Sequence, residues 1–139
     1  MAANEPIEVD RHAAVVPRVG PLKLKAQLFC GGEPAMGPGK AALLEAIDRE
    51  GSISAAGRAL GMSYRRTWLL VDSMNRCWLE RLVETTPGGG QGKGARVTPF
   101  GHRVLGAYRR LEGVMLMAAA ADDLATLVAA LRPEPQSHA

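Results

Sequence analysis

The chain has 139 residues, a length that suits one domain, and 47% of them are apolar while only 4% are aromatic. Its two cysteines, Cys30 and Cys77, lack the spacing of a disulfide framework or a zinc site. The polar start predicts no secretory signal, and no apolar run reaches the roughly 18 residues of a membrane span. We therefore expect a cytoplasmic protein with no membrane partner.

The net charge of +3 is unevenly distributed along the chain. Residues 58–110 hold ten Lys/Arg and three Asp/Glu, a net charge of +7. Residues 1–57 carry −1 and residues 111–139 carry −3. A basic zone favours a polyanion partner through phosphate neutralisation, although a solvated basic face without any partner is the alternative.

Residues 1–20 mix Pro, Gly and charge without a period, and we expect an N-terminal arm there. Residues 22–30 alternate apolar and polar side chains, which predicts a half-buried strand. Residues 31–39 are rich in Gly and Pro and predict a loop.

Three helices are expected next. Residues 39–50 form the first, which Gly51 terminates. Ser52 can cap a short second helix that ends at Gly61. Ser63 can cap a third helix that runs to about Cys77, on which the tryptophans are expected in the core.

Residues 79–84 predict a short strand, residues 87–94 a glycine-rich loop, and residues 95–98 a return strand. Thr98 and Pro99 then supply a cap and a first helical residue. Apolar residues at helical spacing predict one long helix over 100–131, and residues 132–139 a Pro-rich flexible tail.

This order of elements is typical of a winged helix-turn-helix over residues 21–99, a mainly α fold with a small β-wing. A helix fits the major groove of DNA, its first residues reach the base edges, and arginine can bond guanine there. A glycine-rich wing lets the backbone approach the sugar-phosphate wall. The predicted DNA-binding residues are Ser52, Ser54, Ser63, Tyr64, Arg65, Arg66, Gln91, Lys93 and Arg96.

No catalytic or metal motif competes with this interpretation. The glycine-rich segments around Lys40 and Lys93 lack the spacing of a phosphate loop, and the three histidines are scattered. No nucleophile elbow occurs. We therefore predict no enzyme and no metal. The arginine pair at 65 and 66 could alternatively be solvated surface charge.

The long helix carries an apolar stripe that one small domain cannot cover, so we expect it to pair with a second copy of the chain. Packing against the arm at residues 1–20 is the alternative. The predicted dimerisation residues are Phe100, Val104, Tyr108, Leu111 and Met115.

The sequence also resembles a known family. The run at 51–76, GSISAAGRALGMSYRRTWLLVDSMNR, and the glycine-rich run at 88–94 that exits into a helix at Val97-Thr98, resemble the N-terminal domain of ModE, the bacterial molybdate-dependent transcription regulator. The resemblance covers about residues 22–116. It implies a dimeric winged helix that binds operator DNA, with the helix from Ser63 reading the bases and residues 88–94 as the wing.

By the same resemblance, genes of molybdenum uptake or molybdoenzymes are the expected targets. Full-length members carry a molybdate-binding module after the winged helix, and we expect none within this chain, so no cofactor is predicted. The expected function is a repressor that binds a palindromic site on double-stranded DNA as a homodimer. A winged-helix protein-interaction module, or a regulator that responds to another small effector, is the alternative.

Overall fold

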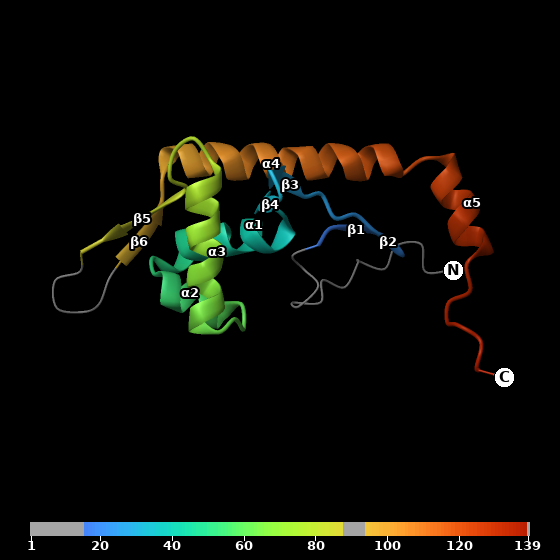
Figure 1. Cartoon of the computed structure of the whole chain (residues 1–139). Coiled ribbons are helices and arrows are strands. Elements are labelled where there is room, and N and C mark those ends of the chain that lie inside the picture. The colour runs from blue at the N-terminus through green and yellow to red at the C-terminus, as the bar shows by residue number, and fades with distance from the viewer. Residues whose placement is uncertain (1–15, 88–93, 139) are drawn as a thin grey trace.

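The computed structural model describes residues 16–87 and 94–138, and these form a mainly helical protein with small antiparallel strand pairs (Figure 1). Each strand pairs only with its neighbour along the chain, which gives three two-stranded sheets among the described residues. The elements in chain order are β1 Arg18–Val19, β2 Leu22–Lys23, β3 Leu28–Cys30, β4 Glu33–Met36, α1 Pro38–Glu50, α2 Ile53–Ala59, α3 Tyr64–Cys77, β5 Val83–Thr86, β6 Gly94–Val97, α4 Pro99–Ala119 and α5 Asp122–Ala130.

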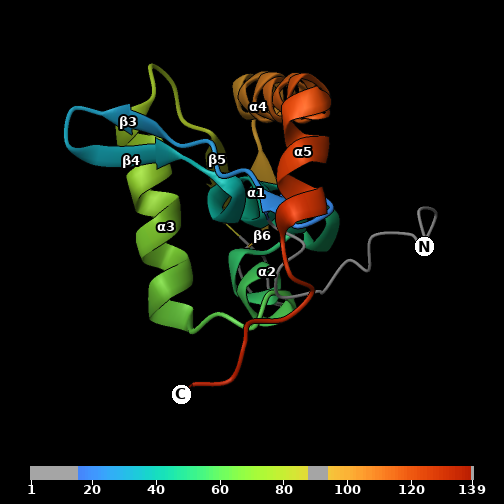
Figure 2. The same cartoon turned by 90° about the vertical axis from the view of Figure 1, so that its right-hand side faces the viewer.

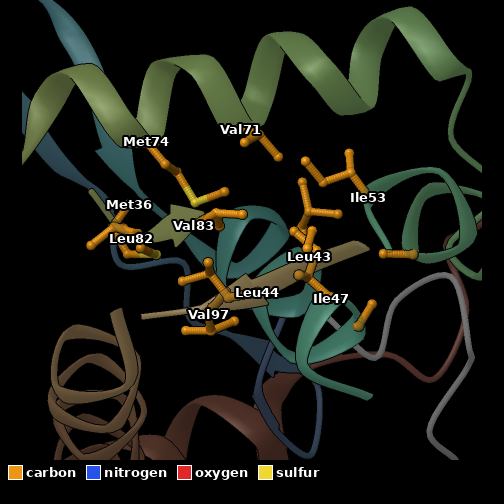
Figure 3. Close-up of a cluster of buried hydrophobic side chains, with 14 of the residues drawn as sticks. Met36, Leu43, Leu44, Ile47, Ile53, Val71, Met74, Leu82, Val83 and Val97 are labelled. Carbon is orange, nitrogen blue, oxygen red and sulfur yellow. The ribbon is translucent and has the colours of Figure 1, made fainter. Parts of the chain in front are cut away.

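The hydrophobic core is built around α1. Leu43, Leu44 and Ile47 are fully buried on this helix, and α2, α3, β4, β5 and β6 each add side chains against them (Figure 3). As the composition predicts, the core is aliphatic, and Trp68 and Trp78 are only half-buried at its edge. The core fixes α3 against α1 and leaves the other face of α3 exposed.

Two glycine turns separate the first three helices, as the sequence predicts. Gly51 and Gly61 adopt positive φ angles of 72° and 70°, a region that favours glycine because a Cβ would clash with the backbone. Ser52 and Ser63 follow them and cap α2 and α3. Gly57 of α2 lies so close to α3 that an added Cβ would overlap the Thr67 side chain.

The β5–β6 hairpin is attached to both α1 and α3. Val83 pairs with Val97 in the ladder, and the Ala95 N–H donates to the Gly51 carbonyl at 2.9 Å. Asn75 of α3 accepts from the amides of Leu82 and Val83 at 2.9 and 3.1 Å, so its side chain holds the chain where β5 begins. This hydrogen bonding explains why the strand starts at Val83 and not at residue 79 as predicted.

Helix α4 begins at a capped turn and crosses one end of the molecule. Thr98 accepts from the Gly101 N–H at 2.9 Å, and a Cβ at Gly101 would overlap the Leu82 carbonyl. Further along, Tyr108 is buried and donates to the Ala26 carbonyl at 2.7 Å. The first half of α4 is therefore part of the domain and covers its core.

Next to Tyr108, a charged network reinforces this attachment. Arg109 donates to Glu45 of α1 at 2.7 Å and to the buried Glu112. Burial lowers the pKa of Arg109, but the hydrogen bonds to the two carboxylates outweigh burial and raise it. Burial and the charge of Glu112 raise the pKa of Tyr108, so the phenol stays protonated in the physiological range.

The structure corrects three further sequence-based expectations. The strand predicted over 22–30 is divided into β2 and β3, and its burial alternates only over residues 22–27, because all three residues of β3 are exposed. The loop predicted over 31–39 contains β4, which returns from β3 through Gly31 at a φ of 59°. The helix predicted over 100–131 is two helices that meet at 70°.

The break between α4 and α5 has a physical reason. Asp122 and Asp123 form the first turn of α5, where negative charge interacts favourably with the free N–H groups and the dipole of a helix. The same aspartates would be unfavourable near the end of α4. Ala121 is extended and precedes the new helix as its N-cap.

Candidate nucleic-acid interface

The first turn of α3 presents polar and basic side chains to solvent. Ser63 caps the helix by accepting from the Arg66 N–H at 3.1 Å. Tyr64, Arg65 and Arg66 follow, and all four residues from Ser63 to Arg66 are exposed. The Tyr64 ring packs against the Trp68 ring, with 6.0 Å between the ring centroids, and Tyr64 is still 66% exposed. Predicted site residues therefore do lie together at one helix end.

Both arginines of this turn have their charges available for a ligand. Within residues 16–87 and 94–138, neither Arg65 nor Arg66 forms an ion pair. A guanidinium group without an ion-pair partner keeps its N–H donors available for an acceptor on a ligand. This segment faces solvent and does not pack into the core. An inward orientation would have contradicted a role in binding.

Lys40 of α1 is a half-buried basic residue beside β4 that the sequence analysis did not predict. Its ammonium group donates to the Pro34 carbonyl at 2.9 Å. Burial lowers the pKa of Lys40, and the positive charge of Arg66 contributes in the same direction.

The two serines predicted on α2 differ in their surroundings. Ser52 accepts from the Ala55 N–H at 3.1 Å as a helix cap, which leaves its hydroxyl hydrogen available to donate. Ser54 is half-buried in the first turn of the same helix.

On the β5–β6 hairpin, Arg96 is exposed but already has a partner. Its guanidinium donates to the Glu84 carboxylate at 2.7 and 3.2 Å, across the ladder where the two residues are register partners. Its charge is therefore largely neutralised within the chain. The other predicted wing residues, Gln91 and Lys93, lie outside the described residues.

The exposed turn of α3 and helix α4 lie at opposite ends of the molecule. Figures 1 and 2 are related by a turn about the vertical axis, and in both α4 lies at the top while α3 begins at the bottom beside α2. A ligand on the first turn of α3 thus leaves α4 uncovered.

The residues predicted for dimerisation differ in how far the chain itself covers them. Phe100, Val104 and Met115 are half-buried, and Tyr108 is only 3% exposed because it packs on its own chain. Leu111 is 45% exposed. Val104, Tyr108 and Leu111 line one side of an open apolar cavity of about 330 Å³ whose other side includes Leu28 and Trp78.

The sequence analysis missed the most exposed apolar residues of this region. Val114 and Met117 on α4 are 64% and 80% exposed, and Leu127 on α5 is 66% exposed. Val114 and Met117 continue the apolar stripe of α4 at helical spacing. The bend after Ala119 turns α5 away from the direction of α4, so the stripe does not continue straight into α5.

The described residues were also compared with the requirements of a metal site and of a membrane-spanning helix. No group of three or more His, Cys, Asp or Glu side chains is placed there to hold a metal ion. No single helix within these ranges is both long and apolar enough to cross a membrane, and only the bent pair α4 and α5 meets that test jointly.

The chain is similar in sequence to several known proteins of the ModE and Mop type. The molybdenum-pterin-binding protein MopA of Rhodobacter capsulatus is 39% identical over 98 residues, which are 70% of this chain and 37% of that protein. The molybdenum transport protein ModE of Azotobacter vinelandii is 46% identical over 70 residues, 50% of this chain and 26% of that protein. The chain is a homologue of the ModE and Mop proteins.

The DNA-binding transcriptional dual regulator ModE of Escherichia coli K12 is 34% identical over 97 residues, which are 70% of this chain and 35% of that protein. The chain therefore matches only about a quarter to somewhat more than a third of the length of these ModE and Mop relatives. No protein-family model matches the sequence. The expected resemblance to ModE is confirmed.

Proposed function

We propose that the chain is a sequence-specific DNA-binding transcription regulator in which α2 and α3 form a helix-turn-helix and β5–β6 forms the wing. The observation that carries this proposal is the solvent-exposed first turn of α3, where Arg65 and Arg66 lack ion-pair partners among the described residues. A capped helix of 14 residues with basic side chains on its first turn suits the major groove.

The surroundings of this turn support the same proposal. Gly61, the Ser63 cap and the close contact of Gly57 with Thr67 fix the direction of α3 relative to α2. Preorganised side chains lose less entropy when they bind. Ser52, which caps the preceding helix α2, keeps its hydroxyl hydrogen available as a donor for a phosphate oxygen.

The relatives support the biological context of the proposal. One is named as a DNA-binding transcriptional regulator and another as a molybdenum transport protein. We propose that this chain represses genes of molybdenum uptake or molybdoenzymes in the cytoplasm, and that it binds a palindromic operator as a homodimer. In that arrangement the half-sites lie about one helical turn of DNA apart.

The test is fluorescence anisotropy with labelled promoter fragments, from the chain's own gene and from molybdenum-transport genes, against an excess of unrelated DNA. The double variant Arg65→Ala, Arg66→Ala should lower specific affinity by at least about 10-fold, because each base contact contributes about 1–3 kcal/mol. Its affinity for unrelated DNA should change much less.

A control variant removes one positive charge at a distant place on the chain. Arg110 is an exposed arginine on α4, at the far end of the molecule from the first turn of α3. Arg110→Ala should leave specific affinity within about twofold of the parent, since only distant screened charge is lost. If the parent chain binds every fragment equally, or if Arg110→Ala weakens binding as much as the double variant, the proposal is wrong.

A further inference from the structure

Glu33 organises a cluster of side chains where the β3–β4 hairpin meets the last turns of α3 (Figure 2). Its carboxylate accepts from the Ser73 hydroxyl at 2.9 Å and from the Cys77 thiol at 3.2 Å, and it pairs with Arg76 at 3.1 Å. These contacts come from three positions on one face of α3. Glu33 thus adds a polar attachment between the hairpin and the helix, beside the hydrogen bond from the Trp78 indole to the Ala35 carbonyl.

Cys30 belongs to the same cluster through the ladder of the hairpin. It is the register partner of Glu33, and directly opposite residues of an antiparallel pair project to the same face with Cβ atoms about 4.5–5.5 Å apart. Because Glu33 reaches Cys77 from that face, Cys30 is the ladder partner of the residue that contacts Cys77. Cys30 is exposed and Cys77 is half-buried.

The Cys77 thiol is affected electrostatically by its neighbours in this cluster. Burial of Cys77 and its hydrogen bond to Glu33 raise the pKa of this thiol, and the charge of Cys30 contributes to the same increase. The turn that carries Cys30 has room to move, because a Cβ at Gly31 or Gly32 would meet no atom within 4 Å. A small shift of the hairpin end is therefore sterically open.

We propose that Cys30 and Cys77 form an intramolecular disulfide when the chain meets a peroxide, which makes this cluster an oxidation site that joins the hairpin to the end of α3. The proposal is independent of DNA binding, because the cluster lies at the opposite end of α3 from Arg65 and Arg66. It rests on the ladder register of Cys30 with Glu33, on the contact of Glu33 with Cys77, and on the unpacked hairpin turn.

The chemistry balances with one peroxide molecule per chain. The exposed Cys30 thiolate attacks a peroxide oxygen, the O–O bond breaks, and hydroxide leaves as water after taking a proton. The Cys77 sulfur then attacks the resulting sulfenic acid of Cys30. An S–S bond forms, the S–O bond breaks, and a second water leaves. The two thiols are oxidised by two electrons in total, and the peroxide is reduced by two.

Glu33 has a defined part in the second step. The Cys77 S–H donates to its carboxylate, so Glu33 is placed to accept the proton as the sulfur attacks. Arg76 stays paired with Glu33 and with Asp72 at 2.8 Å, which holds the carboxylate in position.

The experiment treats the full chain with one equivalent of hydrogen peroxide and follows mass, free thiols and melting temperature. Intact mass should fall by two hydrogen atoms with no dimer on a non-reducing gel, and both free thiols should disappear. The melting temperature should rise by roughly 5–15 °C, because the crosslink closes a long loop in the unfolded chain. A dithiol reductant should reverse all three changes.

Cys30→Ser is the matched control, since this exposed position contributes little to the core. Its chain should gain oxygen at Cys77 or stay unmodified, with no rise in melting temperature. Cys77→Ser should behave likewise, and its circular dichroism shows whether it is folded. Retention of both thiols by the parent chain, oxygen addition without a crosslink, or a disulfide only between two chains would each overturn the proposal.

Discussion

Arg96 shows how a single ion pair changes what a basic residue can contribute. It was predicted from sequence as a DNA contact, but the register of β5 and β6 places Glu84 directly opposite it. The pair is exposed, with 63% and 46% of the two side chains accessible, so water screens it and it contributes little to stability. Its main effect is to lower the positive charge of the hairpin.

We therefore expect Glu84→Gln to strengthen DNA binding. The substitution frees Arg96 to neutralise a phosphate, and the slope of log affinity against log salt concentration should steepen by about 0.9. The measurement is anisotropy at several salt concentrations. Asp123→Asn, an exposed acidic residue on α5, makes the same charge change elsewhere and should leave the slope unaltered. Equal slopes for the parent and Glu84→Gln would contradict the expectation.

Gly57 is important for packing because it has no side chain at the point where α2 meets α3. Thr67 is 1% exposed beside it, and its hydroxyl donates to the Ser63 carbonyl at 2.8 Å. Any side chain at position 57 would push this threonine and the start of α3 away from α2.

Gly57→Ala should accordingly lower the free energy of unfolding by about 1–3 kcal/mol, the usual range for overpacking in a core. Gly113 is the matched control. It lies in α4 with no atom within 4 Å of an added Cβ, so Gly113→Ala should raise the free energy of unfolding by about 0.5–1 kcal/mol through helix propensity. Urea denaturation measures both. Two changes of the same sign would show that the contact between α2 and α3 is looser than described.

At the scale of elements, the sequence predicts best what local chemistry determines. The bounds of α1, α2 and α3 follow from glycines and capping serines that act within a few residues, and all these caps are found. The β3–β4 hairpin was missed because Gly31, Gly32 and Pro34 together indicate a loop, while its contacts with α3 are some 40 residues away in sequence. The pairing of Arg96 with Glu84 was missed because it depends on strand register.

The contact between the hairpin and α3 should be sensitive to acid. Hydrogen bonds from Cys77, Ser73 and Arg76 lower the pKa of Glu33 in the folded chain. A lowered folded pKa means that this stability is fully present above the unfolded value of about 4.3 and is lost as pH falls through the folded value.

Glu33→Gln removes the titrating group and tests this directly. Above about pH 5 the variant should melt at a lower temperature than the parent, and the gap should close as pH falls below about 4. Thermal melts across that range provide the measurement. Glu80→Gln, an exposed acidic residue without an ion pair among the described residues, should show no such pH-dependent gap. A gap that stays constant with pH would show that Glu33 acts through packing and not through its charge.

At the scale of the whole molecule, α4 has two halves with different surroundings. The half that includes Gly101 and Tyr108 packs on the domain, whereas the half that includes Val114 and Met117 leaves apolar side chains in water. Helix α5 has no buried residue at all within its bounds. Contiguous apolar surface of this kind marks an interaction site on a soluble protein.

A second copy of the chain is the occupant we predict for this surface, because homo-oligomers with twofold symmetry bury the same patch on both subunits. The variant Val114→Glu, Met117→Glu places two negative charges in the exposed stripe and should convert a dimer to a monomer in sedimentation velocity. Since neither side chain is buried in the chain, its melting temperature at low protein concentration should change little. Leu69→Glu, a similarly exposed apolar residue on α3, should remain a dimer. A parent chain that sediments as a monomer, or a double variant that stays dimeric, would show that α4 and α5 serve a different contact.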